Sequence, residues 1–209
     1  MARNRRKEKK MKSDKVVFLE GKKVYLRPLD ADSDLALCQR WINDPNTRPF
    51  IGSGNIPVSA EREKQFFEET EDRKFPRNII LGIVVKKTGK LIGTMGLHDI
   101  NWIDRSATTG ALIGDKTNRG RGYGTEAKEL LLDYAFNTLN LHRINSQCLS
   151  YNAASRRYSE KCGYRLEGRL RQAIYKDGRY YDLIQLGLLR SDWQKRSAPA
   201  RRQQKKRST

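Results

Sequence analysis

The stretch Asn118-Arg119-Gly120-Arg121-Gly122-Tyr123-Gly124-Thr125 decides how this chain of 209 residues is interpreted. Its three glycines alternate between a β-like run that ends near Ile113 and an amphipathic helical pattern that starts near Thr125. Glycine reaches unusual dihedrals and leaves no side chain between its N–H group and a ligand. A helix directly behind such a loop offers unpaired N–H groups and a positive dipole end, which favour a phosphate. A tight turn in which glycine serves only geometry is the alternative interpretation.

Two common phosphate-binding motifs do not fit this stretch. A P-loop requires G-x-x-x-x-G-K-[ST], and no Lys-Ser or Lys-Thr pair follows these glycines. A dinucleotide-binding fold requires G-x-G-x-x-G near the first strand of an alternating βαβ chain. Here the spacing is G-x-G-x-G, and several antiparallel-looking strands precede the loop. Both nucleotide interpretations therefore fail on residue type and on position.

The periodicity of apolar residues predicts seven strands and four helices. The predicted strands cover residues 22–29, 78–87, 90–98, 105–113, 143–149, 164–171 and 180–189, and the predicted helices cover 32–43, 59–70, 125–137 and 153–162. Thr88-Gly89, between the second and third strands, indicates a hairpin. Ser59 is expected to cap the second helix, with Glu63 near the capping-box distance. With no internal repeat and no linker, this order predicts one α+β domain with a mixed sheet.

Most of the net charge of +19 lies at the two ends of the chain. Residues 1–15 contain eight Lys or Arg and two acidic residues, and residues 195–209 contain seven Lys or Arg and no acidic one. Because such segments bury little apolar surface, we expect basic disordered tails over residues 1–20 and 194–209, around a domain of residues 21–193. Such tails can contact nucleic acid or ribosomes non-specifically through phosphates, or serve only as solubilising tails.

The composition predicts a water-soluble protein of a reducing compartment. No run approaches the ~18 apolar residues that a membrane span requires, and no apolar segment of a secretory signal follows the basic N-terminus. Cys38, Cys148 and Cys162 are widely spaced and form no C-x-x-C pair, so neither a zinc site nor a disulfide framework is indicated. We therefore expect a cytoplasmic location, no membrane contact and no bound metal.

Several separate motifs occur in the order that one known family uses. They are Val24–Leu29, Trp41–Asp44, Arg119-x-x-Gly122-x-Gly124, Asn152–Ser155, Glu160–Tyr164, Glu167-Gly168, Asp177–Asp182 and Trp193. This set resembles the Gcn5-related N-acetyltransferase (GNAT) superfamily, and within it the branch of ribosomal-protein-alanine and spermidine acetyltransferases. The resemblance extends roughly from Gly21 to Trp193. It implies a single domain with a mixed central sheet of about seven strands, splayed at the acetyl-CoA site and flanked by about four helices.

The resemblance also implies where acetyl-CoA binds. The backbone N–H groups of Arg119, Gly120, Arg121, Gly122, Tyr123, Gly124 and Thr125 would hold the pyrophosphate at a helix N-terminus. The pantetheine arm would pair like an extra strand with Leu112 and Ile113, because an amide-bearing arm can use unpaired backbone groups. Asn152 would bind the pantetheine or adenosine side, although an isolated Asn here is also an ordinary helix cap.

The catalytic groups implied by the resemblance are hydroxyls and a base. Ser155 would lie one turn into the helix that follows Asn152, near the thioester sulfur. Its hydroxyl would there act as the acid for the departing thiolate, and Tyr158 carries the other hydroxyl on that helix. An attacking amine is mostly protonated near neutral pH, so a base or a water chain must accept a proton. His98 is the candidate whose pKa range suits a base, with Asp99 and Glu167 as further candidates.

The sequence leaves the acceptor open. Some relatives that modify ribosomal proteins carry Glu where this chain has Ile174, so that base is missing. We expect acceptor contacts from residues 46–58, from the second helix and from the last hairpin. Trp102, Tyr175 and Tyr181 could line the acceptor side or serve as core aromatics.

The resemblance implies an acetyl-CoA-dependent N-acetyltransferase that transfers the acetyl group directly to a primary amine in a ternary complex. A protein N-terminus, a polyamine, an aminoglycoside and an amino sugar are the acceptor classes. The alternative function is a ribosome- or RNA-associated binding module in which CoA binding is vestigial. The chain could act as a monomer or as a homodimer.

Overall fold

The computed structural model describes residues 16–52, 54–68 and 75–196. Its strands are β1 Leu19–Glu20, β2 Val24–Pro28, β3 Ile79–Val85, β4 Leu91–Asn101, β5 Ser106–Ile113, β6 Arg143–Leu149, β7 Arg165–Lys176 and β8 Arg179–Leu189. Its helices are α1 Ala31–Asn43, α2 Ala60–Glu68, α3 Tyr123–Asp133 and α4 Ala153–Lys161, with the 3-10 turns η1 Arg48–Phe50 and η2 Lys116–Asn118 and the π-helical turn η3 Tyr134–Thr138. Residues 190–196 form a further helical segment after β8.

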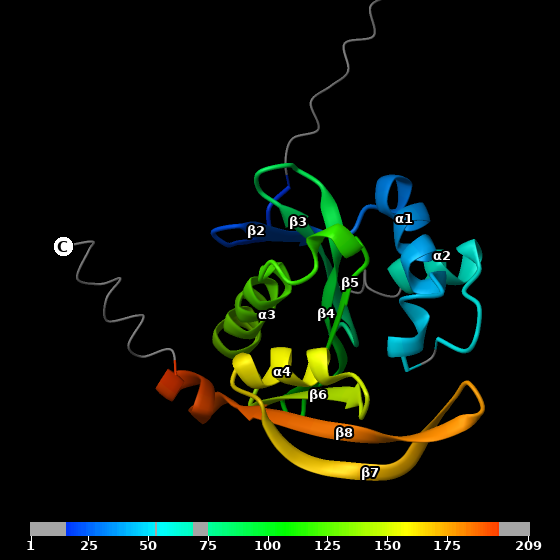
Figure 1. The fold of residues 1–209 in the computed structure, drawn as a ribbon. Coiled ribbons are helices and arrows are strands. Elements are labelled where there is room, and N and C mark those ends of the chain that lie inside the picture. The colour runs from blue at the N-terminus through cyan, green and yellow to red at the C-terminus, as the bar shows by residue number, and fades with distance from the viewer. Residues whose placement is uncertain (1–15, 53, 69–74, 197–209) are drawn as a thin grey trace, which may run out of the picture.

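In the described part of the chain, the strands form one sheet in the order β1-β2-β3-β4-β5-β6-β8-β7 (Figure 1). Neighbouring strands are antiparallel, except for β5 and β6, which are parallel. The central strand β3 reads IILGIVV, and such β-branched residues suit a buried pleated strand. Gly89, with φ of 66°, closes the predicted hairpin between β3 and β4.

The strands β5 and β6 separate partway along their length. Their pairing runs from Ser106 opposite Arg143 to Thr109 opposite Ser146 and then stops. Beyond that point β5 stays paired with β4 as far as Ile113, while β6 stays paired with β8 as far as Leu149. One edge of residues 110–113 therefore has no strand partner among the described residues, which is the splayed sheet that the resemblance implies.

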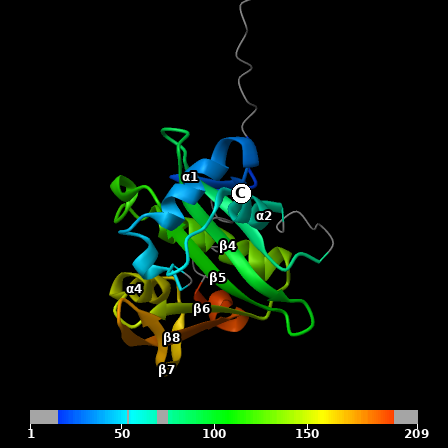
Figure 2. The ribbon, with the colours of Figure 1, turned by 90° about the vertical axis from the view of Figure 1, so that its right-hand side faces the viewer.

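Helices cover both faces of the sheet. Leu131 and Leu132 of α3 and Phe136 of η3 are fully buried in the main core against the sheet. On the other side, α1 and α2 pack together around a smaller cluster that contains Cys38 and Trp41. Figures 1 and 2 show α1 and α2 across β4 and β5 from α3. The opening between β5 and β6 therefore connects the face of the sheet that α3 covers with the face that α1 and α2 cover.

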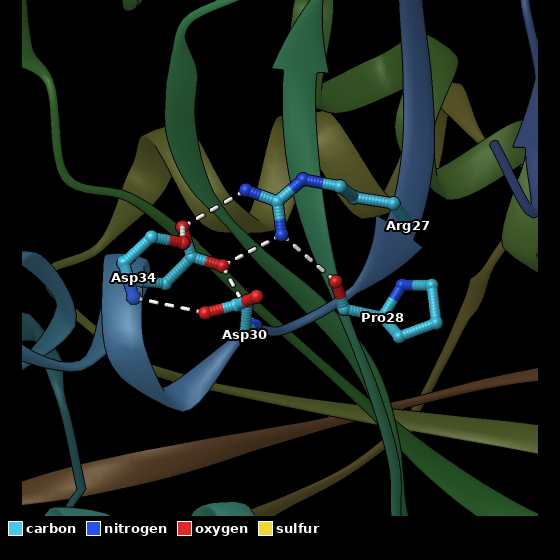
Figure 3. Close-up of polar contacts among 5 residues, drawn as sticks. Arg27, Pro28, Asp30 and Asp34 are labelled. Atoms are coloured by element: carbon cyan, nitrogen blue, oxygen red, sulfur yellow. Dashed lines mark hydrogen bonds and ion pairs between the residues drawn. The ribbon is translucent and has the colours of Figure 1, made fainter. Parts of the chain in front are cut away.

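Arg27, at the end of β2, joins the sheet to α1. Its Nη1 and Nη2 atoms donate to Asp34 Oδ2 and Oδ1 at 2.6 and 2.8 Å (Figure 3). Asp34 is only 3% exposed and also accepts from the backbone N–H of Asp30 at 2.9 Å. The Asp30 side chain in turn caps α1 by accepting from Ser33 N. This bidentate ion pair raises the pKa of Arg27 and fixes the start of α1 to the sheet.

The structure confirms the single α+β domain with a mixed sheet and extends the domain at both ends. The strand β1 pairs with β2 before the predicted domain start at residue 21, and Phe18 packs edge-on against Tyr134. These apolar contacts hold residues that the sequence places in a tail. The helix of residues 190–196 is likewise additional to the four predicted, and it runs past the predicted boundary at residue 194. Residues 1–15 and 197–209 of the predicted tails lie outside the described residues.

Candidate active site

A cavity of about 860 Å³ occupies the opening between β5 and β6. Its walls come from residues 109–113 of β5 and 146–148 of β6, from α1 and α2 on one side, and from α3 and α4 on the other. Of the residues predicted from the sequence to bind the cofactor, all but Arg121 line it, as do the catalytic candidates Ser155, Tyr158 and His98. Arg121 is exposed on the loop before α3. The structure thus brings the predicted set together around one space.

The glycine loop ends in the N-terminus of α3, as the sequence indicates, although the helix begins at Tyr123 and not at Thr125. Gly122 is the N-cap residue, with φ of 83°, and Gly120 has φ of 73°. Both lie in the left-handed region, which costs a residue with a side chain about 1–2 kcal/mol. The first N–H groups of a helix lack intrahelical partners, so the start of α3 offers donors to the cavity.

Arg119 connects the loop to both sides of the cavity. Its Nε donates to the carbonyl of Ile113 at 2.9 Å, and its Nη2 donates to the hydroxyl of Thr47 at 3.2 Å. The guanidinium therefore fixes the end of β5 to the segment that follows α1. The Ile113 carbonyl, on which pantetheine pairing is predicted, already accepts this hydrogen bond, while Leu112 also lines the cavity.

Asn152 is the N-cap of α4, since its Oδ1 accepts from Ser155 N at 3.0 Å. The cap interpretation of this residue is confirmed, and its Nδ2 donor has no partner among the described residues. Ser155 is half-buried on the cavity wall. Tyr158 lies one turn further along, with its hydroxyl 3.9 Å from Met95 Sδ, and burial raises its pKa well above the ordinary value. Both hydroxyls thus line the cavity as protonated donors.

Lys128 of α3 is a cavity residue that sequence reasoning missed. It is 2% exposed, and its Nζ donates to Ser159 Oγ at 3.0 Å. The same Nζ lies 4.3 and 4.5 Å from the ring centroids of Tyr158 and Tyr164. Burial lowers its pKa to about 8, because no carboxylate contacts it in the described part of the chain. A Lys among the apolar residues of α3 is the only sequence signal that could have indicated it.

His98, near the end of β4, lines the cavity. Its imidazole has no hydrogen-bond partner among the described residues. Burial lowers its pKa below the ordinary 6.5, with Asp99 acting weakly in the opposite direction. Asp99 itself pairs with Arg77 at 2.9 Å on the surface, and Glu167 pairs with Arg143. Of the three candidate bases, only His98 reaches the cavity.

The side of the cavity where we expect the acceptor is built from α1, α2 and the segment after α1. Cys38, Ile42, Phe50, Ile51 and Phe66 make it largely apolar. Of the regions from which we expect acceptor contacts, residues 46–58 and α2 contribute side chains to the cavity, and the last hairpin does not line it. Trp102, Tyr175 and Tyr181 also lie outside the lining, where they contact Phe75, Tyr180 and Tyr151 respectively.

The hairpin β7–β8 affects the cavity indirectly, through hydrogen bonds to the segment that carries Phe50 and Ile51. The buried Lys176 donates from Nζ to the carbonyl of Ile51 at 2.6 Å, and Asn55 Nδ2 donates to the carbonyl of Tyr175 at 2.8 Å. The hydroxyl of Tyr151 donates to the carbonyl of Pro49. These bonds position the segment that carries Phe50 and Ile51, and none of them is visible in the sequence pattern.

Within residues 16–52, 54–68 and 75–196, no group of three or more His, Cys, Asp or Glu side chains is placed to hold a metal ion. Among the helices that the structure describes, none has the length and apolar character needed to cross a membrane.

A family model for the acetyltransferase (GNAT) domain matches residues 23–165, which contain the splayed strands, the glycine loop and α4. The chain belongs to the GNAT family. The probable N-acetyltransferase YjcK of Bacillus subtilis (strain 168) is 33% identical over 181 residues, 84% of this chain and 98% of that protein. A spermidine N(1)-acetyltransferase of Vibrio cholerae is 33% identical over 131 residues, 62% of this chain and 75% of that protein.

The GNAT fold is confirmed by solved structures. A crystal structure of spermidine N-acetyltransferase from Vibrio cholerae, in complex with CoA and spermine, has a TM-score of 0.74 and 26% identity over 82% of this chain and 98% of that one. The predicted family, fold class and enzyme class are therefore confirmed, and the chain is a GNAT N-acetyltransferase.

Proposed function

We propose that this GNAT enzyme transfers an acetyl group from acetyl-CoA to a primary amine by direct attack in a ternary complex. The observation that supports it best is the cavity through the splayed strands. One end lies against the glycine-capped N-terminus of α3, and the other end is an apolar pocket beneath α1 and α2. This arrangement suits a long anionic donor and a separate acceptor that meet between the strands.

The residues at the donor end fit the chemical parts of CoA. The N–H groups at the start of α3 and the side chains of Arg157 and Lys161 provide donors and positive charge for the phosphates. The open edge of residues 110–113 provides backbone groups for the pantetheine amides. When bound, acetyl-CoA supplies the activated acetyl thioester.

His98 and Ser155 carry the proton transfers in this proposal. His98 is neutral at pH 7 because burial lowers its pKa, so its imidazole can accept a proton from the acceptor ammonium. Ser155 donates a hydrogen bond from the opposite wall to the sulfur as the thiolate leaves, and Tyr158 is the second donor. Each of these groups lines the same cavity.

Thiol release from acetyl-CoA in the presence of an amine panel tests the reaction. The panel comprises an Ala-initiated peptide, spermidine, an aminoglycoside and an amino sugar. We expect thiol release with at least one amine, and a Ser155→Ala variant that loses turnover more than CoA affinity. Tyr158→Phe is the matched comparison. Unchanged turnover in Ser155→Ala would transfer the acid role to Tyr158 or water.

Nucleic-acid or ribosome contact stays a prediction from the basic tails, since residues 1–15 and 197–209 lie outside the described residues. Removal of both tails separates it from catalysis: we expect thiol release to be retained without them. A cytoplasmic location, expected from the cysteine pattern, and a monomeric or homodimeric state also stay predictions from the sequence.

A further inference from the structure

Glu63 of α2 is a buried carboxylate that faces the cavity without a partner. It is 6% exposed and lines the cavity beside Phe66 of the same helix. Among the described residues, nothing hydrogen-bonds or ion-pairs with its side chain. Its backbone N–H donates to the Ser59 carbonyl, while the Ser59 hydroxyl accepts from Arg62 N. The capping-box interpretation of Glu63 is therefore wrong, because the helix is capped without its carboxylate.

An unpaired carboxylate in this position is costly to the free protein. Burial raises the pKa of Glu63, which is the expected response of an acid surrounded by apolar groups. It also helps to raise the pKa of the Cys38 thiol nearby, second to burial itself. A buried charge is tolerated when an opposite charge pairs with it. The Glu63 carboxylate lines the cavity, so such a partner can reach it from there. The group that completes its interactions therefore enters from the cavity.

The cavity has opposite charges at its two ends. In the described lining, Glu63 is the only acidic side chain, and it lies on the side of α1 and α2. The basic residues, Arg119, Lys128, Arg157 and Lys161, come from the glycine loop, α3 and α4. The basic end, formed by the glycine loop, α3 and α4, therefore favours phosphates, and the end that carries Glu63 favours a cation. A primary amine arrives as such a cation near neutral pH.

We infer that Glu63 receives the reacting ammonium of the acceptor, and that the acceptor carries a single cationic centre on an apolar body. This inference rests on the proposed function and names its substrate class. One carboxylate can pair with one ammonium, whereas the further ammonium groups of a polyamine would meet Cys38, Ile42 and Phe66. Aromatic rings of Phe66 and Phe50 suit both the apolar body and its cation.

The charge balance of the reaction agrees with this role. The ammonium binds Glu63, and one proton then passes to His98 before the neutral nitrogen attacks the acetyl carbon. The C–S bond of the thioester breaks as the C–N bond forms. The nitrogen then loses its second proton, which passes through the Ser155 hydroxyl to the departing thiolate, while His98 releases the first proton to solvent. The product amide is neutral, so it no longer pairs with Glu63 and its release is favoured. Glu63 thus acts in acceptor binding, and its loss should raise KM more than it lowers kcat.

Binding measured with CoA in place of acetyl-CoA tests the site without turnover. The probe is 2-phenylethylamine, titrated calorimetrically into the CoA complex of the full chain. We expect at least ten-fold weaker binding of the probe to Glu63→Gln and unchanged affinity for CoA. Glu61→Gln is the matched control, because Glu61 is exposed on the same helix and loses the same charge. Spermidine should bind the parent more weakly than 2-phenylethylamine.

The results separate this inference from the proposed function. Equal affinity of Glu63→Gln and the parent for the probe, tighter binding of spermidine, or no binding of the probe to the parent would each overturn the inference. Thiol release by the parent in the amine panel reports on the proposed function independently. Binding of the probe that depends on Glu63, without thiol release, would retain the ammonium site and remove the acetyl transfer.

Discussion

The imidazole of His98 lies over Gly110, at a place where any side chain would collide with it. A Cβ atom added to Gly110 would lie 2.6 Å from His98 Nε2 and 2.9 Å from Cδ2. The two residues are on neighbouring strands, with Gly110 opposite Gly96 and His98 opposite Thr108. The imidazole therefore lies along the sheet surface, over the space that glycine leaves. Gly110 determines where the candidate base lies in the cavity lining.

Gly110→Ala should displace the imidazole and lower turnover at least ten-fold. The side chain of His98 can rotate, so we expect a smaller effect on folding, of about 1–3 kcal/mol. Steady-state kinetics and urea denaturation measure the two effects. Gly168→Ala is the control, because a Cβ there meets only Gln185 Cβ at 4.0 Å. Full turnover in Gly110→Ala would show that the position of His98 is not needed.

The pH dependence of turnover should report on His98. Its pKa is lowered below 6.5 by burial, so the imidazole is neutral above that pH and becomes protonated as the pH falls. A protonated imidazole cannot accept the amine proton, so kcat should fall on the acidic side, at a pH below 6.5. His98→Gln should lose roughly 10²–10⁴-fold in kcat together with this limb. An acidic limb that persists in His98→Gln would assign it to another group.

The glycine loop could be interpreted from sequence because its chemistry is local. Gly120 and Gly122 need left-handed dihedrals, and the helix pattern directly follows them, so adjacent residues imply the geometry of the loop, whereas the CoA ligand is implied by the resemblance of the whole motif set. Ser155 and Asn152 were likewise predicted within one motif. The apolar periodicity and the turn residues between strands were also sufficient to predict most strands and helices.

The individual side chains of the proposed acceptor side could not be predicted in the same way, since they depend on which side of a helix faces the cavity. Glu63 lies in the charged run AEREKQFFE, where its neighbours Glu61 and Lys64 are exposed. Only the packing of α2 against α1 turns Glu63 inward. Lys176 is similar, because its carbonyl partners lie more than 120 residues earlier in the chain. Burial of a charged residue is a tertiary property and leaves no periodic signal.

Gly122→Asp should weaken acetyl-CoA binding at least ten-fold, because it places a carboxylate at the N-cap where the pyrophosphate is proposed to bind. Isothermal titration measures the affinity. Gly89→Asp is a matched control, since Gly89 also has positive φ, at 66°, and a Cβ there meets nothing within 4 Å. It carries the same backbone strain in the β3–β4 turn, away from the cavity. Equal affinities of the two variants would exclude the loop from CoA binding.

Lys128 should make stability depend on pH in the alkaline range. Its pKa is about 8 in the folded protein and 10.5 as the ordinary value. Between these two pH values the unfolded chain binds more protons at this site than the native protein does. The free energy of unfolding contributed by Lys128 therefore rises with pH across this window, by roughly 3 kcal/mol in total.

Lys128→Met should remove that rise and stabilise the protein at pH 7, because no buried ammonium remains to be desolvated. The raised pKa values of buried Tyr158 and Cys162 act in the opposite direction in both proteins, so the difference between parent and variant isolates Lys128. Urea denaturation at pH 7, 8, 9 and 10 provides this difference. Lys87→Met, an exposed change, should leave the pH dependence as in the parent. A constant difference between Lys128→Met and the parent from pH 7 to 10 would contradict a lowered pKa. In that case Lys128 would remain charged in the core, held by Ser159 and the rings of Tyr158 and Tyr164.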